Sequence, residues 1–156
     1  SSAASDVYKR QEEYFLAGFN CAQAVFAAYC DITGLPEETA LRLSSSFGGG
    51  MGKLREVCGA CTGAFAVLGI LYGYSAPDDA EAKTAHYALI RGFAAEFVAI
   101  HGTYICRELL AGISGTDTPE PAERNSEYYR VRPCLRYIHS ACEILDGIIS
   151  GKSQKC

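Results

Sequence analysis

Four of the eight cysteines in this 156-residue chain stand where the sequence predicts the start of a helix. The N–H groups of a helix's first turn have no partner within the helix, and the helix dipole is positive at that end. Both effects stabilise negative charge, so we expect these thiols to have a lowered pKa and to form thiolates, which are nucleophiles and metal ligands. The four residues are Cys21, Cys58, Cys106 and Cys134.

A capping box and a proline mark two of these helix starts. Asn20 and Gln23 have the spacing of a capping box, which places Cys21 in the first turn of a helix. Pro133 suits a first helical position because its φ is already helical and it lacks an N–H, and Cys134 follows it. Basic neighbours should favour the thiolates further: Arg55 near Cys58, Arg107 beside Cys106, and Arg132 and Arg136 around Cys134.

Three of the remaining cysteines fit such a site less well. Cys30 comes nine residues after Cys21, which places it on the opposite side of the same predicted helix. Cys142 lies two turns, about 12 Å, beyond Cys134, so the two cannot readily share a ligand site. We expect Cys30 and Cys142 to be buried core residues and Cys156 to lie in a C-terminal tail.

Cys61 completes a second pattern, the CxxC sequence Cys58-Gly59-Ala60-Cys61 at a predicted helix start. This arrangement is typical of thiol–disulfide oxidoreductases, in which Cys58 would attack and Cys61 would resolve the mixed disulfide. It is not a haem-attachment motif, because Thr62 stands where that motif requires histidine.

The elements that must position these cysteines are helices. Apolar spacing, caps and breakers predict an all-α, single-domain bundle of about six helices without a convincing strand. A Gly/Ala-rich helix at 55–72 should be central, because Gly59, Gly63, Gly69 and Gly73 leave it bare of side chains on one face. The predicted helical ranges are 12–17, 20–30, 36–46, 55–72, 76–100, 104–111 and 133–149. A glycine-dense loop at 48–52 should allow the backbone to approach the cysteines closely.

Composition excludes several classes of function. The net charge is −4 and no lysine or arginine cluster appears, so we expect no nucleic-acid partner. The uncharged stretch at 57–77 is long enough to span a membrane, but its glycines and cysteines favour a buried helix of a protein that is not membrane-spanning. No signal peptide precedes cysteines set in helical sequence, which favours the reducing cytoplasm.

The first eleven residues are interpreted separately. The stretch from Asp6 to Gln11 reads like the translation of a transposon adapter used in preparing sequencing libraries. We therefore take residues 1–11 as a non-native scar, residues 12–151 as the domain and residues 152–156 as a tail.

The ordered motifs resemble the C_GCAxxG_C_C family of redox-active proteins, across essentially all of residues 12–149. The family's four characteristic cysteines match Cys21, Cys58, Cys106 and Cys134, and Cys61 is not among them. The domain is also similar to the non-haem part of split-Soret cytochromes c, which implies an iron–sulfur centre. The matching segments are Asn20-Cys21-Ala22-Gln23-Ala24-Val25, the glycine-rich Phe47–Gly52, Cys58-Gly59-Ala60-x-x-Gly63, Cys106-Arg107-Glu108-Leu109-Leu110 and Pro133-Cys134.

Three functions remain open. The first is electron transfer, to a redox partner protein, through a [2Fe–2S] or [4Fe–4S] cluster or a metal held by the four cysteines. The second is a thiol–disulfide oxidoreductase or thiol redox sensor that uses Cys58 and Cys61. The third is a helical domain with structural zinc or with no cofactor, associated with a membrane transporter. The sequence does not fix the oligomeric state. Of the histidines, only His101 lies near a predicted site.

Overall fold

The computed structural model describes residues 2–154, and the side chains of residues 6–152. Within that range the chain is helical and forms no named strand, so the prediction of an all-α fold is confirmed. Six helices have eight residues or more, and the others are short. The elements are α1 (Ser2–Leu16), α2 (Cys21–Ala28), α3 (Cys30–Thr33), α4 (Glu37–Ser44), η1 (Ser45–Phe47), α5 (Gly48–Met51), α6 (Gly59–Tyr72), α7 (Ala80–His101), α8 (Cys106–Leu109), α9 (Ser126–Val131) and α10 (Cys134–Gln154).

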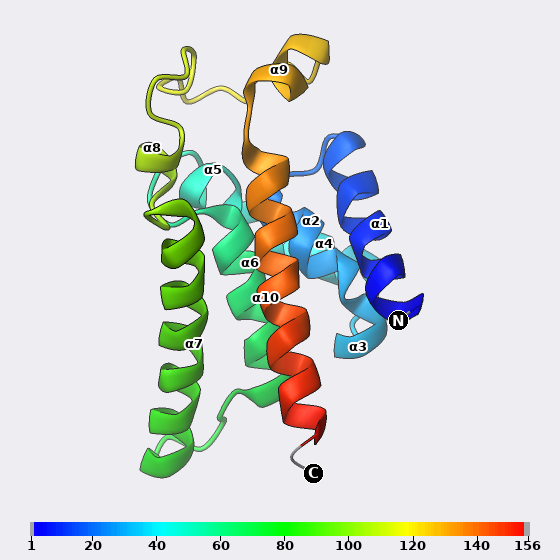
Figure 1. Ribbon diagram of the computed structural model, residues 1–156, viewed down its shortest axis with the longest axis vertical. Helices are drawn as coiled ribbons and strands as arrows, with labels where there is room; N and C mark the ends of the chain where they lie inside the picture. The colour runs from blue at the N-terminus through cyan, green and yellow to red at the C-terminus, as the bar shows by residue number, and fades with distance from the viewer. Residues whose placement is uncertain (1, 155–156) are drawn as a thin grey trace.

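The long helices pack around α6 and α10. In Figure 1, α10 runs down the middle of the view between α7 and α1, and α6 lies behind it. Helices α2 and α4 lie to the right of α6, and the short helices α5, α8 and α9 gather at the upper end, where α10 begins. The upper end of the bundle therefore brings together several helix starts that are far apart in the sequence.

Helix α6 is central because it has no charged residue and two of its glycines meet α2. An added Cβ at Gly59 would lie 3.0 Å from the backbone nitrogen of Ala22, and one at Gly63 would lie 2.7 Å from its carbonyl oxygen. The predicted close packing is confirmed at these two glycines. It is wrong at Gly69, which faces open space, whereas Gly73 ends the helix.

Helix boundaries differ from the prediction in several places. Helix α6 begins at Gly59 rather than at residue 55, because the preceding segment adopts left-handed backbone conformations. The helix predicted over 20–30 breaks at Tyr29 into α2 and α3. Helix α10 runs through Gly151 to Gln154, since a glycine lowers helix stability without ending a well-packed helix.

Helix α1 packs against α2 and α10, and it includes most of the predicted adapter scar. Val7 is buried, and the ring of Tyr8 stacks on His139 with 4.3 Å between centroids. Gln11 is fully buried, yet neither its amide nitrogen nor its amide oxygen has a hydrogen-bond partner. The non-native origin of residues 1–11 stays a prediction.

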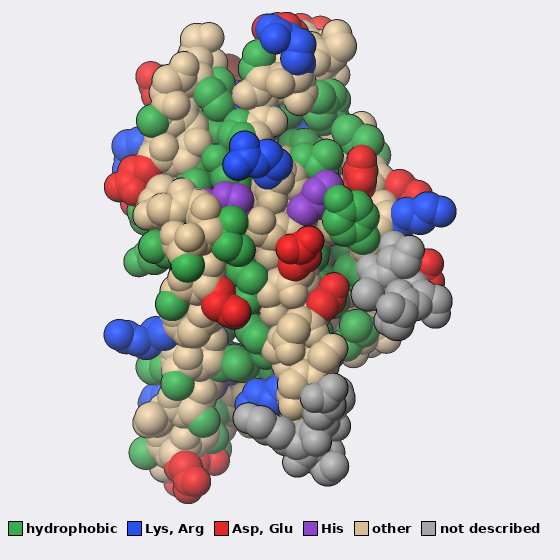
Figure 2. Space-filling model, viewed as in Figure 1, with side chains coloured by type: hydrophobic (Ala, Val, Ile, Leu, Met, Phe, Trp, Pro, Cys, Tyr) green, Lys and Arg blue, Asp and Glu red, His purple; other side chains and the backbone are tan. Residues whose placement is uncertain are grey.

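The surface carries mixed charge. On the face shown in Figure 2, acidic and basic side chains are scattered among apolar ones, and neither sign gathers into a broad patch. In the described part of the chain, no helix combines the length and the apolar character that crossing a membrane requires.

Candidate redox site

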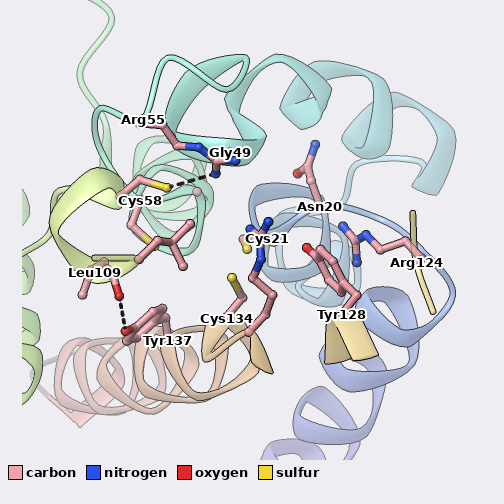
Figure 3. Close-up of a pocket in the computed structure, with 15 residues that line it drawn as sticks. Asn20, Cys21, Gly49, Arg55, Cys58, Leu109, Arg124, Tyr128, Cys134 and Tyr137 are labelled. Atoms are coloured by element: carbon pink, nitrogen blue, oxygen red, sulfur yellow. Dashed lines mark hydrogen bonds between the residues drawn. The ribbon is translucent and has the colours of Figure 1, made fainter. Parts of the chain in front are cut away.

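The structure brings Cys21, Cys58, Cys106 and Cys134 to the wall of one cavity of about 50 Å³ at the upper end of the bundle (Figure 3). Three of these residues are the first residues of α2, α8 and α10, and the fourth is the N-cap of α6. Three are almost completely buried and Cys21 is partly exposed. Four helix starts, remote along the chain, thus converge on one small space.

Local hydrogen bonds hold Cys21 at its helix start. The backbone N–H of Gln23 donates to Oδ1 of Asn20 at 2.9 Å, and the backbone N–H of Asn20 donates to Oε1 of Gln23 at 3.0 Å. The predicted capping box is therefore present. It fixes the direction in which α2 begins and so the position of Cys21 on the cavity wall.

A short antiparallel contact holds Cys58 beside Cys106. The backbone N–H of Cys58 donates to the carbonyl of Tyr104 at 2.8 Å, and that of Cys106 donates to the carbonyl of Glu56 at 2.6 Å. Val57 and the residue before Cys106 form an isolated β-bridge. This pairing places the starts of α6 and α8 side by side.

The glycine-rich segment closes one wall of the cavity, as predicted. Gly49 and Gly50 have left-handed φ values of 65° and 69°. A Cβ added to Gly50 would lie 2.6 Å from the Cβ of Cys106. A Cβ added to Gly48 would come closer still to the side chain of Asn20. The backbone reaches the site only because these residues have no side chains.

The left-handed conformation extends beyond the glycines. Met51, Lys53 and Arg55 have φ values of 70°, 64° and 61°. For a non-glycine residue this region costs roughly 1–2 kcal/mol. Such strain persists where the surrounding structure imposes it, and it occurs often at functional sites.

Cys21 and Cys134 share a hydrogen bond across the cavity. The thiol of Cys21 donates to Cys134, which raises the pKa of Cys21, and burial and the other sulfurs raise it further. The same hydrogen bond lowers the pKa of Cys134, and the positive charges of Arg132, Arg124 and Arg55 lower it as well, against the effect of burial. Of this pair, Cys134 is the residue that ionises first.

Cys106 is affected mainly by burial. Burial raises its pKa, although Nη1 of Arg55 lies 3.6 Å from its sulfur and acts in the opposite direction. The prediction that every helix-start thiol has a lowered pKa is therefore wrong for Cys21 and Cys106. Desolvation and neighbouring sulfurs outweigh the favourable helix terminus at these two positions.

Cys61 lies behind the cavity rather than on its wall. It is fully buried and its thiol donates a hydrogen bond to Cys58, which together with burial raises its pKa. The roles of Cys58 and Cys61 in disulfide exchange stay a prediction.

Several wall residues could not be found from the sequence. Arg124 comes from the long loop before α9, where its guanidinium lies 4.5 Å from the ring centroid of Tyr128 and donates to the carbonyl of Phe19. Tyr137 of α10 donates from its hydroxyl to the carbonyl of Leu109 at 3.1 Å. No motif distinguishes these residues from ordinary surface or core positions.

Two of the predicted basic neighbours lie elsewhere. Arg107 is more than half exposed and pairs with Glu56 at 3.5 Å, and Arg136 does not line the cavity. Arg55 reaches the sulfur of Cys106 rather than Cys58. Arg132 does line the cavity, as expected from its place beside Cys134.

The other candidates lie outside the cavity. Cys142 is buried in the core, as predicted. The prediction of a buried core position is wrong for Cys30, which begins α3 and is partly exposed. Cys156 lies outside the described residues. His101 is partly buried, shares a 2.8 Å hydrogen bond with the hydroxyl of Ser140 and contacts the ring of Tyr137.

The four thiols form a donor set of the kind that metal centres use. Four thiols suit tetrahedral Zn²⁺ or an iron–sulfur cluster, and the cavity between them has room for a small inorganic group. Across the described residues, no three His, Cys, Asp or Glu side chains are grouped closely enough to hold a metal ion as they stand. The residues fit such a group by type and by location.

Comparison with known proteins gives one match. A family model described as "Putative redox-active protein (C_GCAxxG_C_C)" matches residues 19–148. No curated protein and no solved structure matches the chain. The matched range includes all four cysteines that line the cavity.

Proposed function

Since the chain belongs to the C_GCAxxG_C_C family of redox-active proteins, we propose that it transfers electrons through an iron–sulfur cluster held by Cys21, Cys58, Cys106 and Cys134. The observation that carries this proposal is the convergence of these four sulfurs, each from its own helix start, on one cavity. When bound, such a cluster supplies one-electron transfer at a potential set by its ligands and surroundings.

The charge around the cavity supports an anionic centre. Four thiolates carry more negative charge than an iron–sulfur core offsets, so the protein must stabilise the remainder. The N-termini of α2, α6 and α10 lie at the site and contribute partial positive charge there. Arg55, Arg124 and Arg132 add three full positive charges to its wall.

Individual side chains would tune and shield the centre. The guanidinium of Arg55 contacts the sulfur of Cys106, and the thiol of Cys61 contacts Cys58. Hydrogen bonds to ligand sulfurs are a principal control of cluster potential. Tyr128 and Tyr137 cover the cavity and limit the access of water to the sulfurs.

Anaerobic purification tests the proposal. Iron, acid-labile sulfide and zinc are measured together with visible absorbance that bleaches on reduction. We expect iron and sulfide in the wild type, and loss of both in serine variants of each of the four cysteines. Cys30→Ser and Cys142→Ala are matched controls, because neither residue lines the cavity. Unchanged iron and sulfide in Cys134→Ser would overturn the proposal.

Thiol–disulfide exchange is the second candidate, favoured by the hydrogen-bonded thiol pairs. Cys134 as a thiolate would attack an acceptor disulfide, and Cys21 would displace the acceptor's thiolate to leave a Cys21–Cys134 disulfide. The acceptor disulfide is thereby reduced to two thiols. Cys58 and Cys61 offer the same chemistry. A metal-free protein that exchanges disulfides and loses this activity in Cys134→Ser or Cys58→Ser would favour this function.

A third outcome is bound zinc without a redox response, as in a structural site or an accessory domain of a transporter. For electron transfer the expected partner is another redox protein. The seven cysteines of the described residues are free thiols, which suits a reducing compartment such as the cytoplasm.

A further inference from the structure

A second and larger cavity adjoins the cysteine cavity. It measures about 480 Å³, which is within the usual range for small-molecule sites. The two cavities share a wall that includes Arg55, Arg124, Tyr128 and Arg132. Lys53 and the loop residues Pro119 and Pro121 line only the larger one, and none of its lining residues is a cysteine.

The larger cavity is lined by four cations and by no carboxylate. The cations are Lys53, Arg55, Arg124 and Arg132, and no Asp or Glu belongs to the described residues of its wall. Among the side chains of residues 6–152, none of the four makes an ion pair with a carboxylate. Other arginines do pair in this way: Arg10 with Asp31, Arg42 with Glu38, Arg107 with Glu56, and Arg130 with Glu127.

The four cations are held by neutral groups instead. Nε of Arg55 donates to the carbonyl of Thr116 at 2.9 Å, and Nζ of Lys53 donates to the carbonyl of Glu120. The guanidinium groups of Arg124 and Arg132 lie 4.5 Å and 4.9 Å from the ring centroid of Tyr128. Carbonyls and an aromatic ring fix these positions without neutralising the charges.

Gathering these cations is unfavourable in the absence of an anion. Burial lowers the pKa of Lys53, and the neighbouring positive charges of Arg55 and Arg132 lower it further. The carboxylate of Glu120 acts in the opposite direction, with a smaller effect. The chain has 18 Asp and Glu residues and a net charge of −4, yet none of these carboxylates lines the cavity beside the four cations.

Interaction with the cysteine sulfurs explains only some of these four positive charges. Arg132, Arg124 and Arg55 lower the pKa of Cys134, so they serve the smaller cavity as well. Lys53 lines only the larger cavity. The positive charge therefore extends from the cysteine cavity into the larger cavity, which no cysteine of the described residues lines.

We propose that the larger cavity binds a small ligand through a multiply charged oxyanion group of the phosphoryl class, next to the redox centre. Arginine forks match the geometry of such groups, and several cations are suited to a charge of −2 or more rather than to a single carboxylate. The cavity has room for a larger ligand than one phosphate ion. The site exists whether or not a cluster is present, because its walls are made of the chain's own residues.

Calorimetric titration of the reduced, full-length protein tests this inference at low ionic strength. The probes are inorganic phosphate, pyrophosphate, citrate and acetate, and iron and zinc are measured before and after each titration. We expect saturable binding of pyrophosphate, weaker binding of phosphate and no binding of acetate. Citrate carries its charge on carboxylates, so citrate binding as tight as that of pyrophosphate would overturn the assignment of the ligand to the phosphoryl class.

Matched variants identify the site. Lys53→Asn removes the charge but keeps a residue that tolerates the left-handed φ, and Arg132→Gln removes a shared cation. Each should weaken pyrophosphate binding about tenfold or more. Arg91→Gln on α7, an exposed residue outside both cavities, should leave it unchanged. Equal binding by Lys53→Asn and Arg91→Gln would overturn the inference, and so would no binding by the wild type. If the purified protein contains no iron but still binds pyrophosphate, the proposed cluster is wrong and this inference stands.

Discussion

The thiol of Cys21, at the start of α2, donates a hydrogen bond to Cys134, at the start of α10. The contact joins two helices from opposite parts of the sequence at the cavity wall. It also makes the two thiols unequal, because the acceptor is stabilised as a thiolate and the donor is held as a thiol.

The pKa of Cys134 should therefore rise when its partners are removed. In the reduced, metal-free protein we expect Cys21→Ala to raise it, since that hydrogen bond is the largest cause of its lowered pKa. Arg132→Gln should also raise it, by a smaller amount. Ultraviolet thiolate absorbance followed against pH measures this, with Cys30→Ala as the control. An unchanged first ionisation in Cys21→Ala would contradict the assignment of donor and acceptor.

Cys61 should control the potential of the centre without holding it. Cys61→Ala removes the thiol that donates to Cys58, so the reduced and more negative state loses a stabilising contact. We expect iron content to be retained and the reduction potential to fall in an electrochemical titration. Loss of disulfide exchange in a metal-free Cys61→Ala protein would instead support the oxidoreductase function.

Gly50 should be required for the site itself. A Cβ at this position would lie 2.6 Å from the Cβ of Cys106, so Gly50→Ala must displace that cysteine. We expect the variant to lose most of its bound iron. Gly52→Ala is the matched control: its φ is also positive, at 60°, but an added Cβ would lie 3.8 Å from its nearest neighbour, the carbonyl oxygen of Ser46. Equal iron loss in both variants would point to backbone strain rather than to contact with Cys106.

Gly63 should matter for stability, and Gly69 should not. An added Cβ at Gly63 meets the backbone of Ala22, which cannot move aside, so Gly63→Ala should lower the free energy of unfolding by about 1–3 kcal/mol. Gly69→Ala adds a methyl group in open space on the same helix and should raise it by about 0.5–1 kcal/mol. Urea unfolding measures both. A stabilised Gly63→Ala would show that α2 and α6 are not in close contact.

Gln11 should destabilise the fold. Its buried amide has no hydrogen-bond partner, and Gln11→Leu fills a similar volume without that cost, so unfolding should become harder by about 1–3 kcal/mol. Thermal unfolding of the exposed control Glu13→Leu should change by no more than about 0.5 kcal/mol. If Gln11→Leu does not raise the free energy of unfolding, the Gln11 amide has hydrogen-bond partners in the folded protein.

Helix starts were predictable because their signals lie within a few residues of each other. The capping box of Asn20 and Gln23 and the proline before Cys134 marked two of the four sites, and both helices begin there. The start of α6 was misplaced, because left-handed φ values at Lys53 and Arg55 are imposed by contacts rather than by residue type. The family could also be identified from ordered motifs alone.

By itself, the sequence placed Cys21 and Cys134 at helix starts and determined that the fold is all-α, since both depend on local spacing and capping. Only the tertiary structure decided that Cys134 rather than Cys21 ionises first, and that Arg124 joins the wall beside them. Burial and Coulomb interactions depend on distances in space, and here those distances are set by how α2, α6, α8 and α10 pack together. No local pattern encodes them.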